Sequence, residues 1–224
     1  MAQLQSGKYS IAWFKLAEFV VRKEKERALS IYRLLAHSLH DDALSCQLEG
    51  DLLLSFNDTV KALDLYIRAA QLYEANQRFM QAAAVYEHII TLMADQQLAI
   101  EYIFKLVELY VKINNTIKIT TALFILADTL IKDDLFDQLE QILHNSLLTD
   151  EQKYKVGEFA LTKLIEKKPH VESCLLALLD YCLAYCIALN DDEKLSTLLT
   201  KLHLLSPELF TYAQAYTLKM SKRP

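Results

Sequence analysis

The sequence is short of the two residues that most often interrupt regular structure, since it has three glycines and three prolines in 224 residues. Average usage in a chain of this length would give about 16 glycines and about 11 prolines. Strand-rich folds need glycine in their turns, and nucleotide-binding α/β folds need glycine-rich loops, so both classes are disfavoured. Hydrophobic residues make up 53% and charged residues 24%, which excludes a disordered chain. These figures predict an all-helical, packed protein.

The sequence also lacks a region of one charge sign. It has 24 basic and 29 acidic residues, a net charge of −5, divided as 12 and 14 over residues 1–113 and 12 and 15 over residues 114–224. The nearest approach to a basic patch, residues 22–27, alternates in sign, which is typical of a solvated helix junction. Binding to a phosphate backbone needs clustered Lys and Arg. We therefore expect no nucleic-acid partner.

Cysteines and uninterrupted apolar runs are few. Four cysteines favour buried thiols in a reducing compartment over a disulfide framework. Lys15 and Glu18 interrupt the first apolar stretch, so we expect no secretory signal and a cytoplasmic protein. The one run that could suggest a membrane span, residues 173–190, has Asp180 near its middle, where a carboxylate costs about 2.5–3.5 kcal/mol to insert. It is predicted to be a buried helix and not a membrane span.

The apolar residues recur with a helical period nearly everywhere, and the pattern is interrupted about every 17 to 20 residues. The interruptions are at residues 24–25, 40–42, 57–58, 76–77, 95–96, 114–115, 133–134, 148–149, 168–169, 190–191 and 206–207. Most contain Asn, Asp, Ser or Thr, which cap helix starts. Thr149 and Gln152 match a capping box, and Pro169 and Pro207 suit first helical positions. Twelve helices with short loops are predicted, packed as antiparallel hairpins.

Two segments repeat at an offset of 34 residues. Residues 27–36, with Ala28 and Tyr32, align with residues 61–70, with Ala62 and Tyr66. Gly50 precedes Ala62 by twelve residues, residues 13–17 read Trp-x-x-Leu-Ala, and residues 82–86 read Ala-x-x-x-Tyr. Small residues at Gly50, Ala62 and Ala69 would let two helices approach closely, with Tyr66 filling the space between hairpins.

This pattern resembles the tetratricopeptide repeat over residues 9–93. The resemblance implies an all-α, right-handed superhelix of about six antiparallel hairpins. Residues 1–113 are predicted to be tetratricopeptide-like repeats. From Asn114 the resemblance depends on hairpin length alone, so residues 114–224 are either degenerate repeats or a differently packed helical cap. We favour degenerate repeats that continue one array and end in a capping helix.

The capping helix is expected at residues 206–221. Its apolar stripe follows intervals of three and four residues and consists of Leu209, Tyr212, Ala213 and Tyr216. This stripe should lie on the preceding hairpin. The polar residues Thr211, Gln214 and Lys219 should point outward, because the end of a helical array needs a polar outer face.

No pattern of reactive residues predicts catalysis, a metal site or a cofactor. His170, Cys174, Cys182 and Cys186 lie along one stripe, but the first and last would be about 24 Å apart on a helix. His37 and His40 could chelate a cation weakly, although histidines at a helix end more often complement the helix dipole. Paired acids, such as Asp133 and Asp134, fall at expected helix starts. There is no glycine-flanked nucleophile or phosphate-binding loop.

The remaining candidate is a protein-binding groove. In tetratricopeptide arrays the first helix of each hairpin lines a concave surface that holds a peptide or helix. The resemblance places in this groove Ile11, Phe14, Glu18, Val21 and Arg22 from one helix and Leu44, Gln47, Leu48, Asp51, Leu54 and Ser55 from another. The family members that clamp carboxyl termini have Lys, Asn and Arg there, so that ligand is disfavoured. A mildly acidic, apolar groove suits an amphipathic or basic segment.

The sequence therefore predicts a non-enzymatic scaffold or adaptor that binds a protein or peptide partner. Two alternatives stay open. One is a structural subunit of a larger complex, and the other is an all-helical enzyme or ligand-binding domain with a pocket near Asp180, Cys182 or Cys186. The sequence also leaves open whether the chain forms homo-oligomers.

Overall fold

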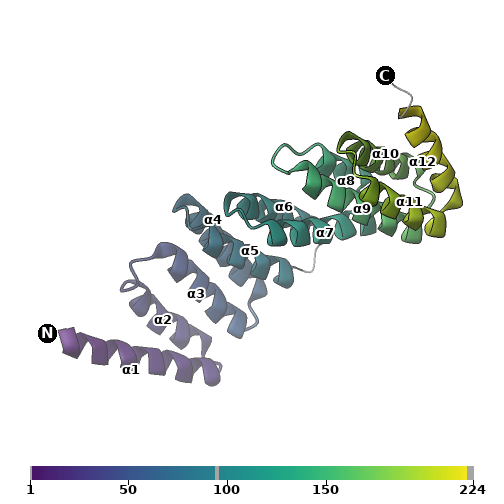
Figure 1. The fold of residues 1–224 in the computed structure, drawn as a ribbon. Coiled ribbons are helices and arrows are strands. Elements are labelled where there is room, and N and C mark those ends of the chain that lie inside the picture. The colour runs from purple at the N-terminus through teal and green to yellow at the C-terminus, as the bar shows by residue number, and fades with distance from the viewer. Residues whose placement is uncertain (1, 94–95, 221–224) are drawn as a thin grey trace. The chain divides into compact units, whose positions relative to one another are not determined.

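The structure is a computed structural model that describes the backbone of residues 2–93 and 96–220 and the side chains of residues 11–93 and 99–220. Every regular element within these ranges is an α-helix (Figure 1). The chain forms two compact units, Met1–Ile113 and Asn114–Pro224, called unit 1 and unit 2 below.

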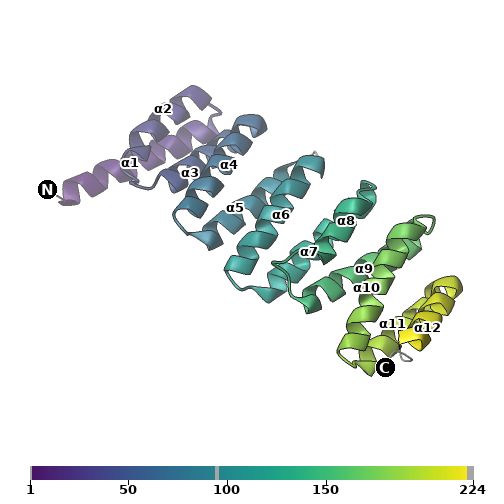
Figure 2. The same ribbon diagram turned by 90° about the horizontal axis from the view of Figure 1, so that it is seen from above.

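Unit 1 contains α1 to α6. Their bounds are α1 Ala2–Val21, α2 Lys25–Ala36, α3 Asp42–Ser55, α4 Thr59–Ala75, α5 Phe79–Leu92 and α6 Gln96–Lys112. Consecutive helices pack as pairs, α1 with α2, α3 with α4 and α5 with α6, and α4 also packs against α5 (Figure 2).

Unit 2 contains α7 to α12. Their bounds are α7 Thr116–Lys132, α8 Phe136–Leu143, α9 Asp150–Lys167, α10 Glu172–Ala188, α11 Asp192–Leu205 and α12 Pro207–Met220. The pairs are α7 with α8, α9 with α10 and α11 with α12. The first helices of successive pairs also contact one another, α7 with α9 and α9 with α11. The second helices do the same, α8 with α10 and α10 with α12.

The all-α prediction and the twelve helices in consecutive pairs are confirmed for the described residues. The predicted interruptions coincide with the helix junctions, although Asp95 lies outside the described residues. Pro207 begins α12 as expected. The expectation for Pro169 is wrong, because Pro169 lies in the turn before α10 and the helix starts at Glu172. The right hand of the superhelix and the continuity of one array stay predictions.

The scarcity of glycine is visible at the turns. Seven junction residues have the positive φ angle that normally favours glycine, and none of them is glycine: Lys23, His40, Asn57, Gln77, Asn114, Asp134 and Asn190. The short polar side chain of asparagine tolerates this conformation. Lysine and glutamine do so at a cost in backbone strain.

The predicted caps are formed at most helix starts. Asp41 accepts from the Leu44 N–H at 3.0 Å, and Asp191 accepts from the Lys194 N–H at 3.0 Å. Thr149 and Gln152 make both hydrogen bonds of the predicted capping box. These bonds satisfy N–H groups that the first helical turn leaves without a backbone partner.

Glycine is used inside helices instead, where two helices approach closely. Gly50 is buried in α3, and a Cβ atom there would lie 2.9 Å from Cε1 of Tyr66 on α4. Tyr66 also meets His88 of α5 edge to face, with ring centroids 4.9 Å apart. Gly50 therefore allows the close approach of α3 and α4, and Tyr66 fills the space towards the next hairpin, as the repeat pattern predicted.

Tyrosine hydroxyl groups donate hydrogen bonds to carboxylates on neighbouring helices. Three examples in unit 1 are Tyr66 to Asp51 at 2.6 Å, Tyr86 to Glu74 at 2.7 Å and Tyr110 to Glu87 at 2.5 Å. Burial, and then the hydrogen bond to the carboxylate, raises the pKa of all three phenols. Each hydroxyl therefore stays protonated and acts as a donor.

The last pair only partly matches the predicted cap. Helix α12 packs on α10 and α11, and Thr211, Gln214 and Lys219 are exposed as predicted. Of the apolar stripe, Ala213 is buried, Leu209 and Tyr216 are half-buried, and Tyr212 is exposed. Tyr212 still donates to Asp180 of α10 at 2.9 Å. Ser221 of the predicted segment lies outside the described residues.

Candidate functional site

The predicted groove residues lie on α1 and α3 of unit 1 in two different environments. Ile11, Phe14, Glu18 and Val21 are exposed on α1, with Phe14 and Val21 77% and 82% exposed, and Arg22 is exposed in the turn directly after α1. Glu18 and Arg22 form an ion pair at 2.5 Å along the helix.

On α3 the predicted residues are mostly half-buried. Leu44, Gln47, Leu48, Leu54 and Ser55 are intermediate in exposure, and Asp51 is exposed. Gln47 accepts a hydrogen bond from the Tyr73 hydroxyl at 3.0 Å, so its side chain supports the α3–α4 contact.

A groove of about 420 Å³ lies between α1, α2 and α3, and is called the α1–α3 groove below. It is lined by Trp13, Leu16, Ala17, Val20 and Val21 of α1, Tyr32 of α2, and Leu48, Asp51, Leu52 and Ser55 of α3. Four of these, Val21, Leu48, Asp51 and Ser55, are among the eleven predicted residues. The structure does not bring the other seven into this groove.

Sequence reasoning missed the floor of the groove. Trp13, Leu16 and Ala17 belong to the repeat pattern, but the repeat spacing did not assign them to the groove. In the structure Leu16 and Tyr32 are buried at the base, while Trp13 stays 39% exposed and Ala17 is exposed. The sequence pattern identified these residues, but it could not predict that they face an opening, because this depends on the distance between α1 and α3.

Polar contacts hold this groove in shape. The Tyr32 hydroxyl donates to the Ser45 carbonyl of α3, and burial raises its pKa. At the α1–α2 turn, the Lys23 ammonium donates to the Ser55 carbonyl at 2.9 Å, and Lys25 pairs with Asp58 at 2.6 Å. These bonds fix the end of α3 against the first hairpin.

Asp51 gives the groove its charge. Its Oδ1 atom accepts from the Tyr66 hydroxyl at 2.6 Å, so the carboxylate is oriented by a buried phenol while the residue itself is exposed. Among the side chains of residues 11–93, no other residue that lines the groove is charged. The groove therefore combines an apolar floor with one fixed negative charge.

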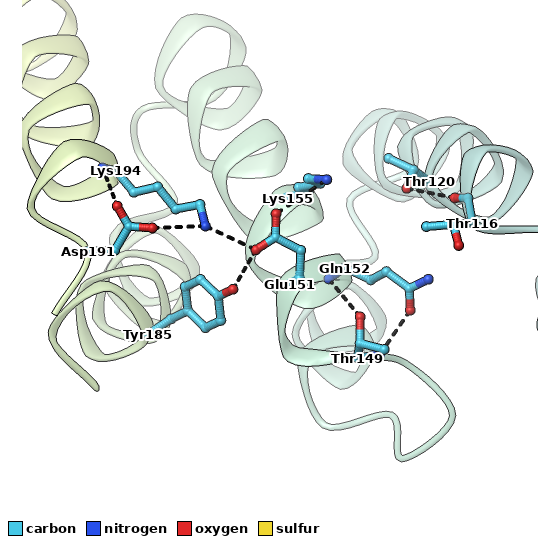
Figure 3. Close-up of polar contacts among 9 residues, drawn as sticks. All are labelled: Thr116, Thr120, Thr149, Glu151, Gln152, Lys155, Tyr185, Asp191 and Lys194. Atoms are coloured by element: carbon cyan, nitrogen blue, oxygen red, sulfur yellow. Dashed lines mark hydrogen bonds and ion pairs between the residues drawn. The ribbon is translucent and has the colours of Figure 1, made fainter. Parts of the chain in front are cut away.

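In unit 2 a polar cluster surrounds Glu151 of α9 (Figure 3). The carboxylate accepts from the Tyr185 hydroxyl at 2.5 Å, and it pairs with Lys194 at 3.1 Å and Lys155 at 3.3 Å. Lys194 also contacts Asp191 at 3.0 Å. The cluster connects α9, α10 and α11.

The pKa shifts in this cluster fit a role in holding helices together and not a role in acid–base catalysis. The Tyr185 hydrogen bond, and then the two lysines, lower the pKa of Glu151, and the two carboxylates raise the pKa of Lys194. A general acid or base acting near neutral pH needs a shift in the opposite direction. The arrangement therefore favours the charged forms of both groups.

The cysteines of α10 are packed in the core. Cys174, Cys182 and Cys186 are buried, and a Cβ at Gly157 would lie 3.1 Å from the Cys182 sulfur. Burial raises the pKa of the Cys174 thiol to about 12. His170 is exposed at the turn before α10. Across residues 11–93 and 99–220, no three His, Cys, Asp or Glu side chains are placed to hold a metal ion.

The apolar run at residues 173–190 corresponds to α10. Its buried residues recur at intervals of three and four and lie on one side of the helix, and α10 packs against α8, α9, α11 and α12. None of the helices in the described part of the chain is long and apolar enough to cross a membrane.

Comparison with known proteins gives little beyond this description. No model of a known protein family matches the chain, and no curated protein matches it. Among solved structures, one titled "Structure of Naa15/Naa10 bound to HypK-THB" is similar at 13% identity and a TM-score of 0.24. The match covers 94% of this chain and 39% of that chain. The proposals below therefore depend on the residues of this chain alone.

Proposed function

We propose that the chain is a non-enzymatic interaction scaffold whose α1–α3 groove binds a helix or extended segment of a partner protein. The observation that carries this proposal is the groove itself, an opening of about 420 Å³ with an apolar floor. That volume lies within the roughly 300–1,000 Å³ typical of ligand-binding clefts.

The lining residues indicate the chemistry of the partner. Leu48, Val20 and Val21 offer apolar contacts, and Trp13 offers a large aromatic surface. Asp51, held by Tyr66, would pair with a lysine or arginine. An amphipathic segment with a basic residue beside its apolar face fits both features.

The groove residues also explain why binding is favoured over catalysis. Among the described side chains its lining contains no histidine, cysteine or lysine, and the Asp51 carboxylate is engaged by a tyrosine hydroxyl. Catalysis by general acid–base or nucleophilic chemistry uses such groups in pairs. A binding surface needs only the apolar contacts and the single charge.

A peptide-binding measurement tests the proposal. The probe is a labelled amphipathic helical peptide with leucines at intervals of three and four and lysines along one edge of that stripe. We expect saturable binding in fluorescence anisotropy, weakened at least about tenfold by Leu48→Glu, because a buried anchor contact typically contributes more than 1 kcal/mol. The control is Leu34→Glu, at an exposed leucine of α2 that does not line the groove.

Two results would overturn the proposal. One is equal affinity for the probe and for a peptide of the same composition in scrambled order. The other is equal loss of affinity in Leu48→Glu and Leu34→Glu, which would place the peptide outside the groove.

A further inference from the structure

Helix α11 presents a row of residues to a second opening, a shallow groove of about 400 Å³. The row follows intervals of three and four residues and consists of Asp192, Leu195, Ser196, Leu199, Thr200 and His203. This spacing places the six residues on one face of three helical turns, about 17 Å long. Leu204 and, from α12, Phe210 complete the lining.

The row lies at the end of the packing order of unit 2. Helix α9 packs against α7, and α11 packs against α9. Helix α12 packs on α10 and α11, yet it leaves this row open, with only Phe210 reaching its edge. The row therefore lies where a further first helix would pack on α11, but no helix covers it within the described chain.

The pattern of the row is complementary to itself. When a second copy of α11 is laid antiparallel, Asp192 meets His203, Leu195 meets Thr200, and Ser196 meets Leu199. The first pairing joins a carboxylate to an imidazole, and the other two join a large apolar side chain to a small one. Each pairing occurs twice around a two-fold axis, which is the geometry of an isologous dimer.

Charge is placed only at the ends of the row. The four central residues are uncharged, so no ion has to lose its water in the middle of such an interface. Lys194 is held by Asp191 and Glu151 and does not line the groove. His203 packs edge to face on Phe210, with centroids 4.9 Å apart, which holds its ring at the rim.

We propose that the chain self-associates through this row, with α11 of one copy packed antiparallel on α11 of a second copy. Three helical turns and a flanking phenylalanine form an interface below the usual size of a permanent complex, so the dimer is expected to be weak and concentration-dependent. The proposal is independent of the α1–α3 groove, which lies in unit 1.

Sedimentation velocity of the full chain, from low micromolar to several hundred micromolar, tests the proposal. We expect a monomer–dimer equilibrium whose dissociation constant increases about tenfold or more in Leu199→Glu. Ser196→Arg should have the same effect, and because Ser196 is exposed this variant is expected to keep the fold. The matched control, Leu34→Glu, should dimerise like the natural chain.

A charge exchange tests the antiparallel register. Asp192→Arg alone should weaken the dimer, because it places a cation opposite the His203 imidazole. His203→Glu alone should weaken it, because it places two carboxylates opposite each other. The double variant D192R/H203E restores opposite charges with their positions exchanged, and should recover the affinity.

Three results would overturn the proposal. They are a monomer at every concentration, a dimer that persists in Leu199→Glu and Ser196→Arg, or a double charge variant that stays as weak as either single one. Leu48→Glu should leave dimerisation unchanged, so failure of the α1–α3 groove and failure of this interface are distinguished.

Discussion

The two units use their first helices differently. In unit 2, α7, α9 and α11 are tied together: Phe124 and Phe159 stack with centroids 4.5 Å apart, Lys167 pairs with Asp128 at 3.0 Å, and Lys201 pairs with Glu158. In unit 1, polar bonds from the α1–α2 turn tie the first hairpin to the end of α3, and the α1–α3 groove stays open beside them. The opening between the first helices of unit 2 is therefore a smaller pocket of about 290 Å³ lined by aromatic and charged side chains, whereas the α1–α3 groove of unit 1 is larger and almost entirely apolar.

The largest expected effect concerns the end of unit 2. Deleting residues 206–224 removes α12, which buries Ala213, half-buries Leu209 and Tyr216, and donates a hydrogen bond to Asp180. Burial of large apolar side chains contributes about 1.5–3 kcal/mol each when complete. We expect a loss of several kcal/mol in the free energy of unfolding and aggregation of the truncated chain, measured by thermal melting and light scattering. A monomer that melts within about two degrees of the full chain, a shift of at most about 1 kcal/mol, would show that α12 is no cap.

Gly50 in α3 and Gly157 in α9 give a sharper comparison between the units. Ala at position 50 must displace the Tyr66 ring, which is buried and bonded to Asp51. Overpacking costs about 1–3 kcal/mol, against a gain of about 1 kcal/mol in helix propensity. We expect Gly50→Ala to lower the free energy of unfolding by about 1 kcal/mol, and by no more than about 2 kcal/mol.

Gly157→Ala is the matched change in unit 2. Its Cβ would meet the Cys182 sulfur at 3.1 Å and the Leu143 side chain at 3.5 Å. Because this contact is looser, the propensity gain should nearly offset the crowding, for a net change within about 0.5 kcal/mol. Urea titrations of both variants measure the difference, and equal losses would contradict the close approach of α3 and α4.

The dependence of stability on pH tests the contacts that Glu151 of α9 makes with its neighbouring helices. The pKa of Glu151 is lowered in the folded chain, first by Tyr185 and then by its lysines. Its contribution to stability is therefore present above the unfolded pKa of about 4.3 and is lost as the pH falls through the lower folded value.

Because Glu151 is partly exposed, we expect Glu151→Gln to cost about 0.5–1 kcal/mol at neutral pH. The difference from the natural chain should vanish in strong acid, as measured by urea unfolding at several pH values. Tyr185→Phe serves as the partner variant, since it removes the same hydroxyl donor. A cost for Glu151→Gln that does not change with pH would mean that the carboxylate charge is not involved.

The smallest effect is expected at a turn. Gln77 has a φ of 58°, which strains a side chain other than glycine or asparagine. Gln77→Gly should raise the free energy of unfolding by about 0.5–1 kcal/mol. Asn57→Gly, at a φ of 62°, should gain less, because asparagine already tolerates this conformation. Chemical denaturation measures both changes, and a loss in Gln77→Gly would contradict the strain.

Local signals in the sequence were sufficient to predict the helices and their junctions. Asp41, Thr149 and Asp191 cap helices because an adjacent N–H group is all that they require, and the Gly50–Tyr66 contact follows from a repeat spacing. The position of Pro169 was wrong because a proline fits a turn as well as a helix start.

The site was less predictable, because it depends on distances between helices. Of the residues that the repeat spacing assigned to a binding groove, Val21 and Asp51 line the α1–α3 groove, whereas Phe14 and Gln47 do not. Trp13 and Ala17 line the groove because α1 stands away from α3, and no local pattern encodes that separation. Tyr32 enters from the second helix of the hairpin, where a search limited to first helices could not find it.

Trp13 makes the central claim directly measurable, because it is the only tryptophan in the sequence and it lines the α1–α3 groove, where it is 39% exposed. The measurement is the tryptophan emission spectrum during titration with the tryptophan-free amphipathic, lysine-flanked peptide. Occupation of the groove should shift the emission to shorter wavelength with saturation, and Asp51→Asn should weaken the apparent affinity by a few fold, consistent with loss of one charge pair of about 1 kcal/mol. Peptide binding detected by anisotropy with no change in Trp13 emission would contradict the account, because the bound segment would then lie elsewhere on the chain.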